Sequence, residues 1–234
     1  MSHTGYAAVA FDLDDTVCRR DQDPNDLYAA AFEGAGVGRF GEPSDLWRAL
    51  TGPPEPNAEH AYFAAGFRVV AARHGRPGVD ADALATALLD AVDHGAVSFT
   101  PGAREALATA REAGPVAVVT NGPEWRQSQK IATLGLAELD AVVYAGDMDR
   151  RKPHPEPFER ACSLLGSRPS ETLFVGDSLE HDVAGAQGAG LPAAWVPSPD
   201  GDHPRTADGR PDPSPFAPEH VLASLTEFPP TVAR

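Results

Sequence analysis

The sequence predicts an α/β protein with a parallel sheet covered by helices on both faces and an all-helical domain inserted into it. Two observations support this prediction. After residue 100, short apolar runs alternate with helical segments, and strands that alternate with helices form parallel sheets. Residues 23–95, in contrast, contain only helical patterns. We therefore expect a Rossmann-like core that carries a helical insertion.

The insertion interrupts the core early in the chain. We expect the core domain to comprise residues 1–17 and 98–234, and the helical domain to comprise residues 18–97. Asp23-Pro24 is a favourable start for the first inserted helix, since Asp caps a helix and Pro fits the first helical position. Three more helices are predicted to begin at Ser44, at Asn57, and at Asp80 or Asp82.

Five short apolar runs are expected to form the strands of the core. An apolar run without polar alternation indicates a strand that is buried on both faces. Residues 198–215 are expected to form an exposed loop, because Pro, Asp and Gly dominate them, and residues 221–225 are predicted to be helical. The five runs are Tyr6–Phe11, Val116–Val119, Ala141–Tyr144, Thr172–Val175 and Ala193–Val196.

Composition narrows the possible functions. The formal net charge of -15 argues against nucleic-acid binding, because contacts to a phosphate backbone require a basic surface. No apolar run is long enough to span a membrane, and the first residues lack the pattern of a signal peptide. We therefore expect a cytoplasmic protein without a membrane partner. Its two cysteines, far apart in the chain, predict neither a disulfide framework nor a zinc site, and its oligomeric state is not predicted.

Arginine carries almost all of the positive charge. The chain contains 17 Arg and only two Lys, Lys130 and Lys152. Together with the many acidic residues, this bias suggests a GC-rich genome or a salt-rich cytoplasm, and a halophilic protein would gain stability in molar salt. Lys130 lies in a predicted helix with no recognisable motif around it, and we expect it on the surface.

Three carboxylates directly follow the first predicted strand. Asp12, Asp14 and Asp15 lie within four residues. Carboxylates at such short distances repel one another unless a cation or solvent separates them. Two interpretations are open. The acids can form a turn and a helix N-cap, or Asp12 can be a nucleophile or metal ligand with Asp14 as its acid/base partner.

Further polar groups follow the later strands. Thr120 and Asn121 end one strand, Asp177 and Asp182 follow another, and Lys152 lies in a loop between them. The carboxyl ends of parallel strands meet at one edge of a sheet, and such a set of groups suits a Mg²⁺ ion and a phosphoryl group. Each group also has a simpler interpretation: Asp177 as an N-cap, Thr120 as a strand-end hydroxyl and Lys152 as a solvated surface charge.

Taken in order, these residues resemble the four motifs of the haloacid dehalogenase superfamily of phosphotransferases. The first motif is matched by Asp-Leu-Asp-Asp-Thr at 12–16 and the second by Thr-Asn-Gly at 120–122. The third is matched by Lys152-Pro153 and the fourth by Gly-Asp-Ser at 176–178 with Asp182. The helical insertion resembles the cap of the first subfamily. Position 15 departs from the most common pattern, in which Gly often replaces the Asp found here.

The resemblance implies a catalytic and a metal-binding role for three acids. Asp12 would attack phosphorus and form an aspartyl-phosphate. Asp14 would protonate the leaving oxygen and then accept a proton from the attacking water. Mg²⁺ would be held by the Asp12 side chain, the Asp14 backbone carbonyl and Asp177.

The resemblance also implies a phosphate site and a function. Thr120, Asn121 and Lys152 would bind the phosphoryl oxygens, and Asp182 would orient a metal-bound water or Lys152. The implied function is Mg²⁺-dependent hydrolysis of a small phosphorylated metabolite of the nucleotide or sugar phosphate type. A phosphomutase would share these residues, whereas a 2-haloacid dehalogenase typically lacks an acid at the position of Asp14. A non-catalytic binding protein would have no need of the full set.

Overall fold

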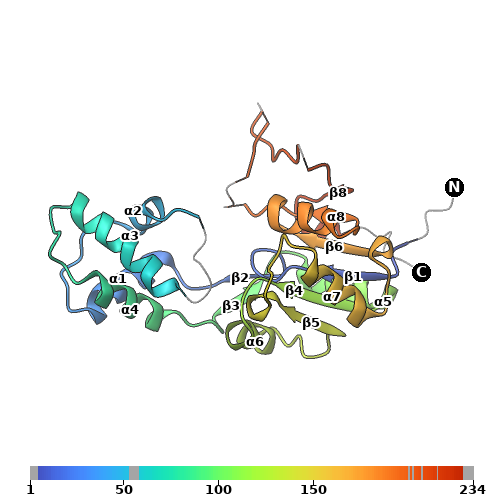
Figure 1. Ribbon diagram of the computed structural model, residues 1–234, viewed down its shortest axis with the longest axis horizontal. Helices are drawn as coiled ribbons and strands as arrows, with labels where there is room; N and C mark the ends of the chain where they lie inside the picture. Colours follow the sequence, from blue (N-terminus) through green and yellow to red (C-terminus); the bar gives the residue numbers. More distant parts are fainter. Residues whose placement is uncertain are drawn as a thin grey trace. The chain divides into compact units, whose positions relative to one another are not determined.

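The computed structural model describes residues 5–52, 58–199, 201, 203–206, 208–214 and 216–228. The chain divides into two compact units (Figure 1). We call Met1–Arg20 with Val97–Arg234 the α/β unit, and Asp21–Ala96 the helical unit. Among the helices of the described residues, none has the length and apolar character needed to cross a membrane.

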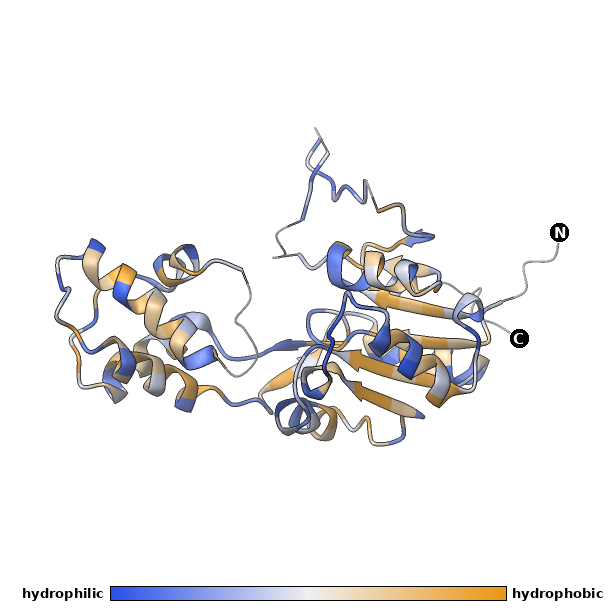
Figure 2. Cartoon of the chain, viewed as in Figure 1, coloured by the Kyte–Doolittle hydropathy of each residue, from blue (hydrophilic) through white to orange (hydrophobic). Residues whose placement is uncertain are grey.

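A six-stranded sheet in the order β5-β4-β1-β6-β7-β8 forms the centre of the α/β unit. All neighbouring strands pair in parallel, and most of their residues are hydrophobic (Figure 2). The five strands predicted from apolar runs are confirmed. The six strands are β1 Ala8–Phe11, β4 Val116–Thr120, β5 Ala141–Tyr144, β6 Thr172–Gly176, β7 Ala193–Trp195 and β8 His220–Val221.

Helices cover both faces of this sheet (Figure 1). On one face pack α5 (Ala103–Ala113) and α6 (Glu124–Thr133), and on the other α7 (Glu156–Leu165), a π-helical turn (Leu179–Ala184) and α8 (Gly185–Gly188). Successive side chains of a strand point to opposite faces, so β1, β4, β6 and β7 each contribute to both hydrophobic clusters. The predicted Rossmann-like core is confirmed.

Two features near the ends of the core differ from the prediction. An antiparallel ribbon of β2 (Cys18–Arg20) and β3 (Val97–Phe99) was not predicted, because three-residue strands are too short to show a pattern. The helix predicted at 221–225 is wrong, because His220–Val221 pairs with β7. Backbone pairing at the sheet edge outweighs the local helical pattern there. Short 3₁₀ turns lie at Ala145–Asp147, Pro169–Glu171 and Leu225–Glu227.

The four predicted helices are present in the helical unit. Asp23 caps the first by accepting a hydrogen bond from the backbone N–H of Asn25, and Asp80 caps the fourth by accepting from Asp82 and Ala83. The predicted start of the third helix, Asn57, lies outside the described residues. The helices are α1 Pro24–Gly34, α2 Pro43–Ala49, α3 Glu59–Arg73 and α4 Ala81–Ala91.

Candidate active site

The central strand β1 delivers the first acid of the site. Phe11 pairs with Val118 of β4 and with Val175 of β6, so the chain leaves the sheet between these two strands. The backbone N–H of Asp12 donates to the carbonyl of Val175 at 2.8 Å, which continues the ladder by one residue. Asp12 is therefore fixed at the carboxyl edge of the sheet, where it is 7% exposed.

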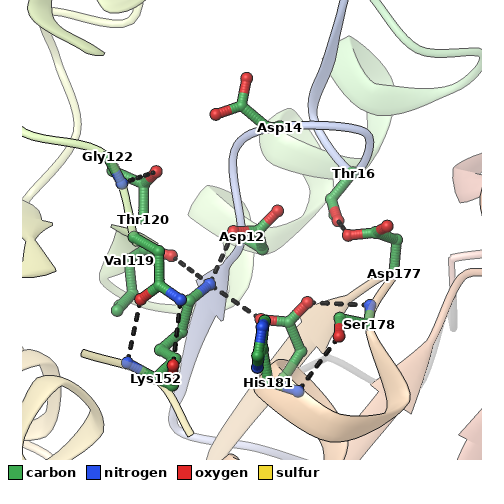
Figure 3. A network of polar contacts seen from close by, with 12 residues as sticks. Asp12, Asp14, Thr16, Val119, Thr120, Gly122, Lys152, Asp177, Ser178 and His181 are labelled. Carbon is green, nitrogen blue, oxygen red and sulfur yellow. Dashed lines mark hydrogen bonds and ion pairs between the residues drawn. The ribbon is translucent and has the colours of Figure 1, made fainter. Parts of the chain in front are cut away.

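Lys152 is buried beside Asp12, with all three N–H groups of its ammonium engaged (Figure 3). Its Nζ donates to Asp12 Oδ1 at 2.6 Å, to Asp182 Oδ1 at 2.8 Å and to the Val119 carbonyl at 2.8 Å. Burial alone would lower the pKa of Lys152, but the two carboxylates outweigh burial and raise this pKa. The simpler interpretation of Lys152 as a solvated surface charge is therefore wrong.

Asp182 is held in place by its own neighbours. It lies in the π-helical turn, is 2% exposed, and accepts from the backbone N–H of Ser178 at 3.0 Å through Oδ2. Gly176 makes this approach possible, because a Cβ at this position would lie 2.5 Å from atoms of the Asp182 side chain. With Lys152 on Oδ1, both oxygens of Asp182 are engaged.

Three carboxylates form a cluster that could hold a cation. Oxygens of Asp12, Asp177 and Asp182 lie within 4.8 Å of one another. From the described residues, Oδ2 of Asp12 accepts no hydrogen bond, and Asp177 accepts one from Thr16 Oγ1 at 3.3 Å through Oδ1. Asp12 and Asp177 therefore each retain carboxylate lone pairs that could bind a cation. Carboxylate oxygens are the ligands that Mg²⁺ prefers.

The electrostatics of the cluster also fit a cation. Burial raises the pKa of Asp12 to about 7, although Lys152 opposes this shift. Burial, followed by the charges of Asp12 and Asp182, raises the pKa of Asp177 to about 8. One ammonium therefore does not compensate three clustered carboxylates. A divalent cation would supply the missing positive charge.

Thr120 and Asn121 shape the turn after β4. Thr120 is 1% exposed, and its Oγ1 accepts from the backbone N–H of Gly122 at 3.2 Å and from Gln127 Nε2 at 2.6 Å. With both lone pairs occupied, the hydroxyl proton is left for donation. The Asn121 amide accepts from the Lys152 N–H at 2.9 Å and donates to the Lys152 carbonyl at 3.0 Å, which joins the two loops.

The carboxylate of Asp14 lies apart from this cluster and points away from Asp12 (Figure 3). Its Oδ1 accepts from Lys130 Nζ, and its Oδ2 accepts from Gln127 Nε2 at 2.6 Å. Burial alone would raise the pKa of Asp14, but Lys130 and then Gln127 outweigh burial and lower this pKa. The structure therefore brings five of the seven predicted residues into one cluster, Asp12, Asn121, Lys152, Asp177 and Asp182. It links the other two, Thr120 and Asp14, through Gln127.

The predicted surface position of Lys130 is wrong, since its side chain is 1% exposed. Sequence reasoning missed both Lys130 and Gln127 because neither matches a motif. The helical spacing held a signal, however. Residues 127, 130, 131 and 134 follow the i, i+3, i+4, i+7 pattern of a single helix face, and all four are buried. The two polar residues therefore lie on the core-facing stripe, beside Ile131 and Leu134.

Asp15 adopts a backbone conformation that explains why Gly often occupies its position in the resemblance. Its φ is 61°, in the left-handed region. Glycine enters this region without steric cost, and Asp is among the few other residues that tolerate it. The backbone N–H of Asp15 donates to the carbonyl of Cys18 at 2.7 Å, which closes the turn after β1.

Comparison with known proteins gives consistent matches. The family model of haloacid dehalogenase-like hydrolases matches residues 6–190. Validoxylamine A 7'-phosphate phosphatase of Streptomyces hygroscopicus subsp. limoneus is 32% identical over 192 residues, which cover 80% of this chain and 83% of that protein. N-acylneuraminate-9-phosphatase of Rattus norvegicus is 35% identical over 114 residues, 48% of this chain. The match spans only 43% of the length of that relative.

A solved structure extends the likeness to the whole fold. The HAD family hydrolase from Deinococcus radiodurans R1, with bound phosphate and sodium, superposes with a TM-score of 0.69. The two chains are 25% identical, and the match covers 96% of this chain and 94% of that one. With the family model matching residues 6–190, the chain belongs to the haloacid dehalogenase-like hydrolases.

Proposed function

We propose that this chain is a Mg²⁺-dependent phosphomonoester hydrolase that acts through an aspartyl-phosphate intermediate. The observation that carries the proposal is the setting of Asp12. Its buried carboxylate lies at the carboxyl end of the central strand, bonded to Lys152 and close to Asp177 and Asp182. The names of its relatives, which include phosphatases for N-acylneuraminate 9-phosphate and validoxylamine A 7'-phosphate, support this reaction class.

In the first step, a carboxylate oxygen of Asp12 attacks phosphorus, and the bond from phosphorus to the ester oxygen breaks. Asp14, which must carry a proton for this step although Lys130 and Gln127 lower its pKa, gives that proton to the leaving oxygen, so that an alcohol departs. The Thr120 hydroxyl, whose proton is available, would donate to a phosphoryl oxygen. The Lys152 ammonium, whose N–H groups are engaged, would stabilise the phosphoryl charge as a point charge. The backbone of Asn121 completes the phosphoryl site.

In the second step, water attacks the phosphorus of the aspartyl-phosphate while the Asp14 carboxylate accepts its proton. Inorganic phosphate leaves and the Asp12 carboxylate is restored. Mg²⁺ would be held by Asp12, Asp177 and the backbone carbonyl of Asp14, and it supplies positive charge that lets an anionic nucleophile approach an anionic ester. Asp182 keeps Lys152 oriented through both steps.

We propose small phosphorylated metabolites of the nucleotide or sugar phosphate type as substrates. The inserted residues 18–97 would have the role that the resemblance implies, a cap domain that selects the organic part of the substrate. The aryl ester p-nitrophenyl phosphate is suitable as a first probe. Its p-nitrophenolate leaves readily, so hydrolysis depends little on how the inserted domain recognises the organic part.

The test is hydrolysis of p-nitrophenyl phosphate with Mg²⁺, with EDTA, and by Asp12→Asn. We expect EDTA to abolish turnover and Asp12→Asn to lower kcat by about 10³-fold or more. Asp149→Asn, which removes an exposed acid, is the matched control and should retain full activity. Turnover that survives Asp12→Asn would disprove the nucleophile, and turnover in EDTA would disprove the metal. Transfer of phosphate to an added sugar, without free phosphate, would indicate a mutase.

A further inference from the structure

We propose that Gln127 and Lys130 of α6 are positioning residues, which hold the Asp14 carboxylate and the Thr120 hydroxyl together as one unit. This inference rests on the proposed function, because it concerns the group that would exchange protons with the substrate. It also gives a role to two residues to which the resemblance assigns none.

The two lysines of the chain provide the first argument. Every other cationic side chain of constant charge is one of 17 arginines, yet Lys130 and Lys152 are both buried at the same edge of the sheet. Each ammonium donates to one of the two acids that flank Leu13: Lys152 to Asp12 and Lys130 to Asp14. A compact ammonium fits a buried contact with one carboxylate, whereas a guanidinium needs a wider planar space.

Gln127 provides the second argument. Its side chain is 1% exposed, and its single Nε2 donates to Asp14 Oδ2 and to Thr120 Oγ1, both at 2.6 Å. Its Oε1 is buried and accepts no hydrogen bond from the described residues. If the amide were turned over, Oε1 could accept from the Thr120 hydroxyl, but it would then face the Asp14 carboxylate. The unpaired oxygen indicates that the contact with Asp14 sets the orientation.

The turn after β4 is packed closely against this glutamine. A Cβ at Gly122 would lie 2.4 to 2.7 Å from atoms of the Gln127 side chain. The turn that carries Thr120 therefore cannot move toward α6 without displacing Gln127. Because α6 begins at Glu124, the turn after β4 leads almost directly into the helix that carries Gln127 and Lys130. A displacement of Gln127 would disturb Thr120 and Asp14 together.

The arrangement leaves Asp14 able to react. Its side chain is 42% exposed, while Lys130 and Gln127 contact it from the buried side. Each carboxylate oxygen has about two lone-pair sites and uses one of them in these contacts. The other can carry the proton that passes to a leaving oxygen, or can accept a proton from a water. A displacement of about 1 Å can cost about 10²-fold in rate, so the two contacts matter for the reaction and not only for folding.

The test compares two esters of similar shape. The p-nitrophenolate of p-nitrophenyl phosphate leaves without a proton, whereas benzyl phosphate must release an alkoxide that needs one. We expect Lys130→Met, which removes a contact with Asp14, to lower kcat/KM for benzyl phosphate by about 10²-fold and for p-nitrophenyl phosphate by less than about 10-fold. Gln127→Leu also releases Thr120, so it should lower both values, with the larger loss on benzyl phosphate. Gln129→Leu, at an exposed position of the same helix, is the matched control and should change neither value.

A double-mutant cycle provides a second readout. In an Asp14→Asn background, Lys130→Met should cause no further loss on benzyl phosphate, because the group that it positions is already absent. Circular dichroism and thermal melting establish that each variant is folded. If Lys130→Met does not fold, Gln127→Leu decides the question with the same pair of esters and the same background.

Failure of this inference differs from failure of the proposed function. Equal losses on the two esters, or fully additive losses with Asp14→Asn, would overturn the positioning role while wild-type turnover upholds the phosphatase. A wild-type chain that hydrolyses neither ester would refute the proposed function, and the positioning role with it.

Discussion

The chain buries its two lysines in different ways. Lys152 has two carboxylates, Asp12 and Asp182, within hydrogen-bond distance, and their side chains are 10% and 2% exposed. Among the described residues, Lys130 has a single carboxylate partner, Asp14, whose side chain is 42% exposed. Both ammonium groups are nearly inaccessible, at 3% and 1%. The first region has more negative than positive charge, and the second is balanced.

The difference in charge balance between the two lysine regions indicates two different roles for a buried ion pair. Removing charges from water is unfavourable unless they are paired and hydrogen-bonded. In the Lys130 region, one ammonium is paired with one carboxylate and needs no further charge. Such a pair can hold the Asp14 side chain in place. In the Lys152 region the pairing is incomplete, because the third carboxylate, Asp177, increases the negative charge. An excess of carboxylates indicates a place for a cation, whereas a balanced pair indicates a structural contact.

The largest expected effect is that of Lys152→Met on stability. It leaves Asp12 and Asp182 buried without a cation, and we expect it to lower the free energy of unfolding by about 3–5 kcal/mol. Lys130→Met should cost only about 1 kcal/mol, because the exposed side of Asp14 can be hydrated. Urea unfolding without Mg²⁺ measures both values. Equal losses would show that the two regions do not differ as described.

A smaller effect is expected from the opposite change at the balanced pair. Asp14→Ala removes the carboxylate that pairs with the Lys130 ammonium, whose side chain is 1% exposed, and should lower the free energy of unfolding by about 2 kcal/mol. Asp149→Ala, at an exposed position, should stay within about 0.5 kcal/mol. A gain in stability on removing Asp14 would contradict this pairing, since it would mean that the acid is strained rather than supported.

The convergence of most site residues could be predicted from the sequence, and the reason is topological. Asp12 and Asp177 each follow a strand and Thr120 ends one, and a parallel sheet brings the carboxyl ends of its strands to one edge. This rule requires only that strands and helices be recognised, which the apolar runs allow. It gives the place of a residue in the fold, but not the partner of its side chain.

The missed features depend on contacts between distant residues. Gln127 and Lys130 lie within α6 and not at the end of a strand, and they fall outside the four motifs. Their burial follows from the face of α6 that packs on the sheet. Their spacing on one helical stripe is the signal in the sequence that indicates burial. The two-residue strand β8 and the ribbon of β2 and β3 carry too few residues for a periodic pattern, so only their pairing reveals them.

The smallest expected effect tests the excess of negative charge directly. Asp177→Asn keeps the size of the side chain and removes one of three clustered carboxylates. Without Mg²⁺, we expect the melting temperature to rise by about 2–4 °C, equivalent to about 1 kcal/mol. In wild type, Mg²⁺ should raise the melting temperature because it binds only the folded chain, and in Asp177→Asn this rise should be much smaller.

The control for this prediction is Glu180→Gln, which removes an exposed carboxylate three residues away. It changes the net charge by the same amount but leaves the cluster of Asp12, Asp177 and Asp182 intact. Its melting temperature and its response to Mg²⁺ should match those of wild type. If Asp177→Asn responded to Mg²⁺ as wild type does, the excess of carboxylates around Lys152 would not be a cation site. Both lysine regions would then serve only to hold side chains in place.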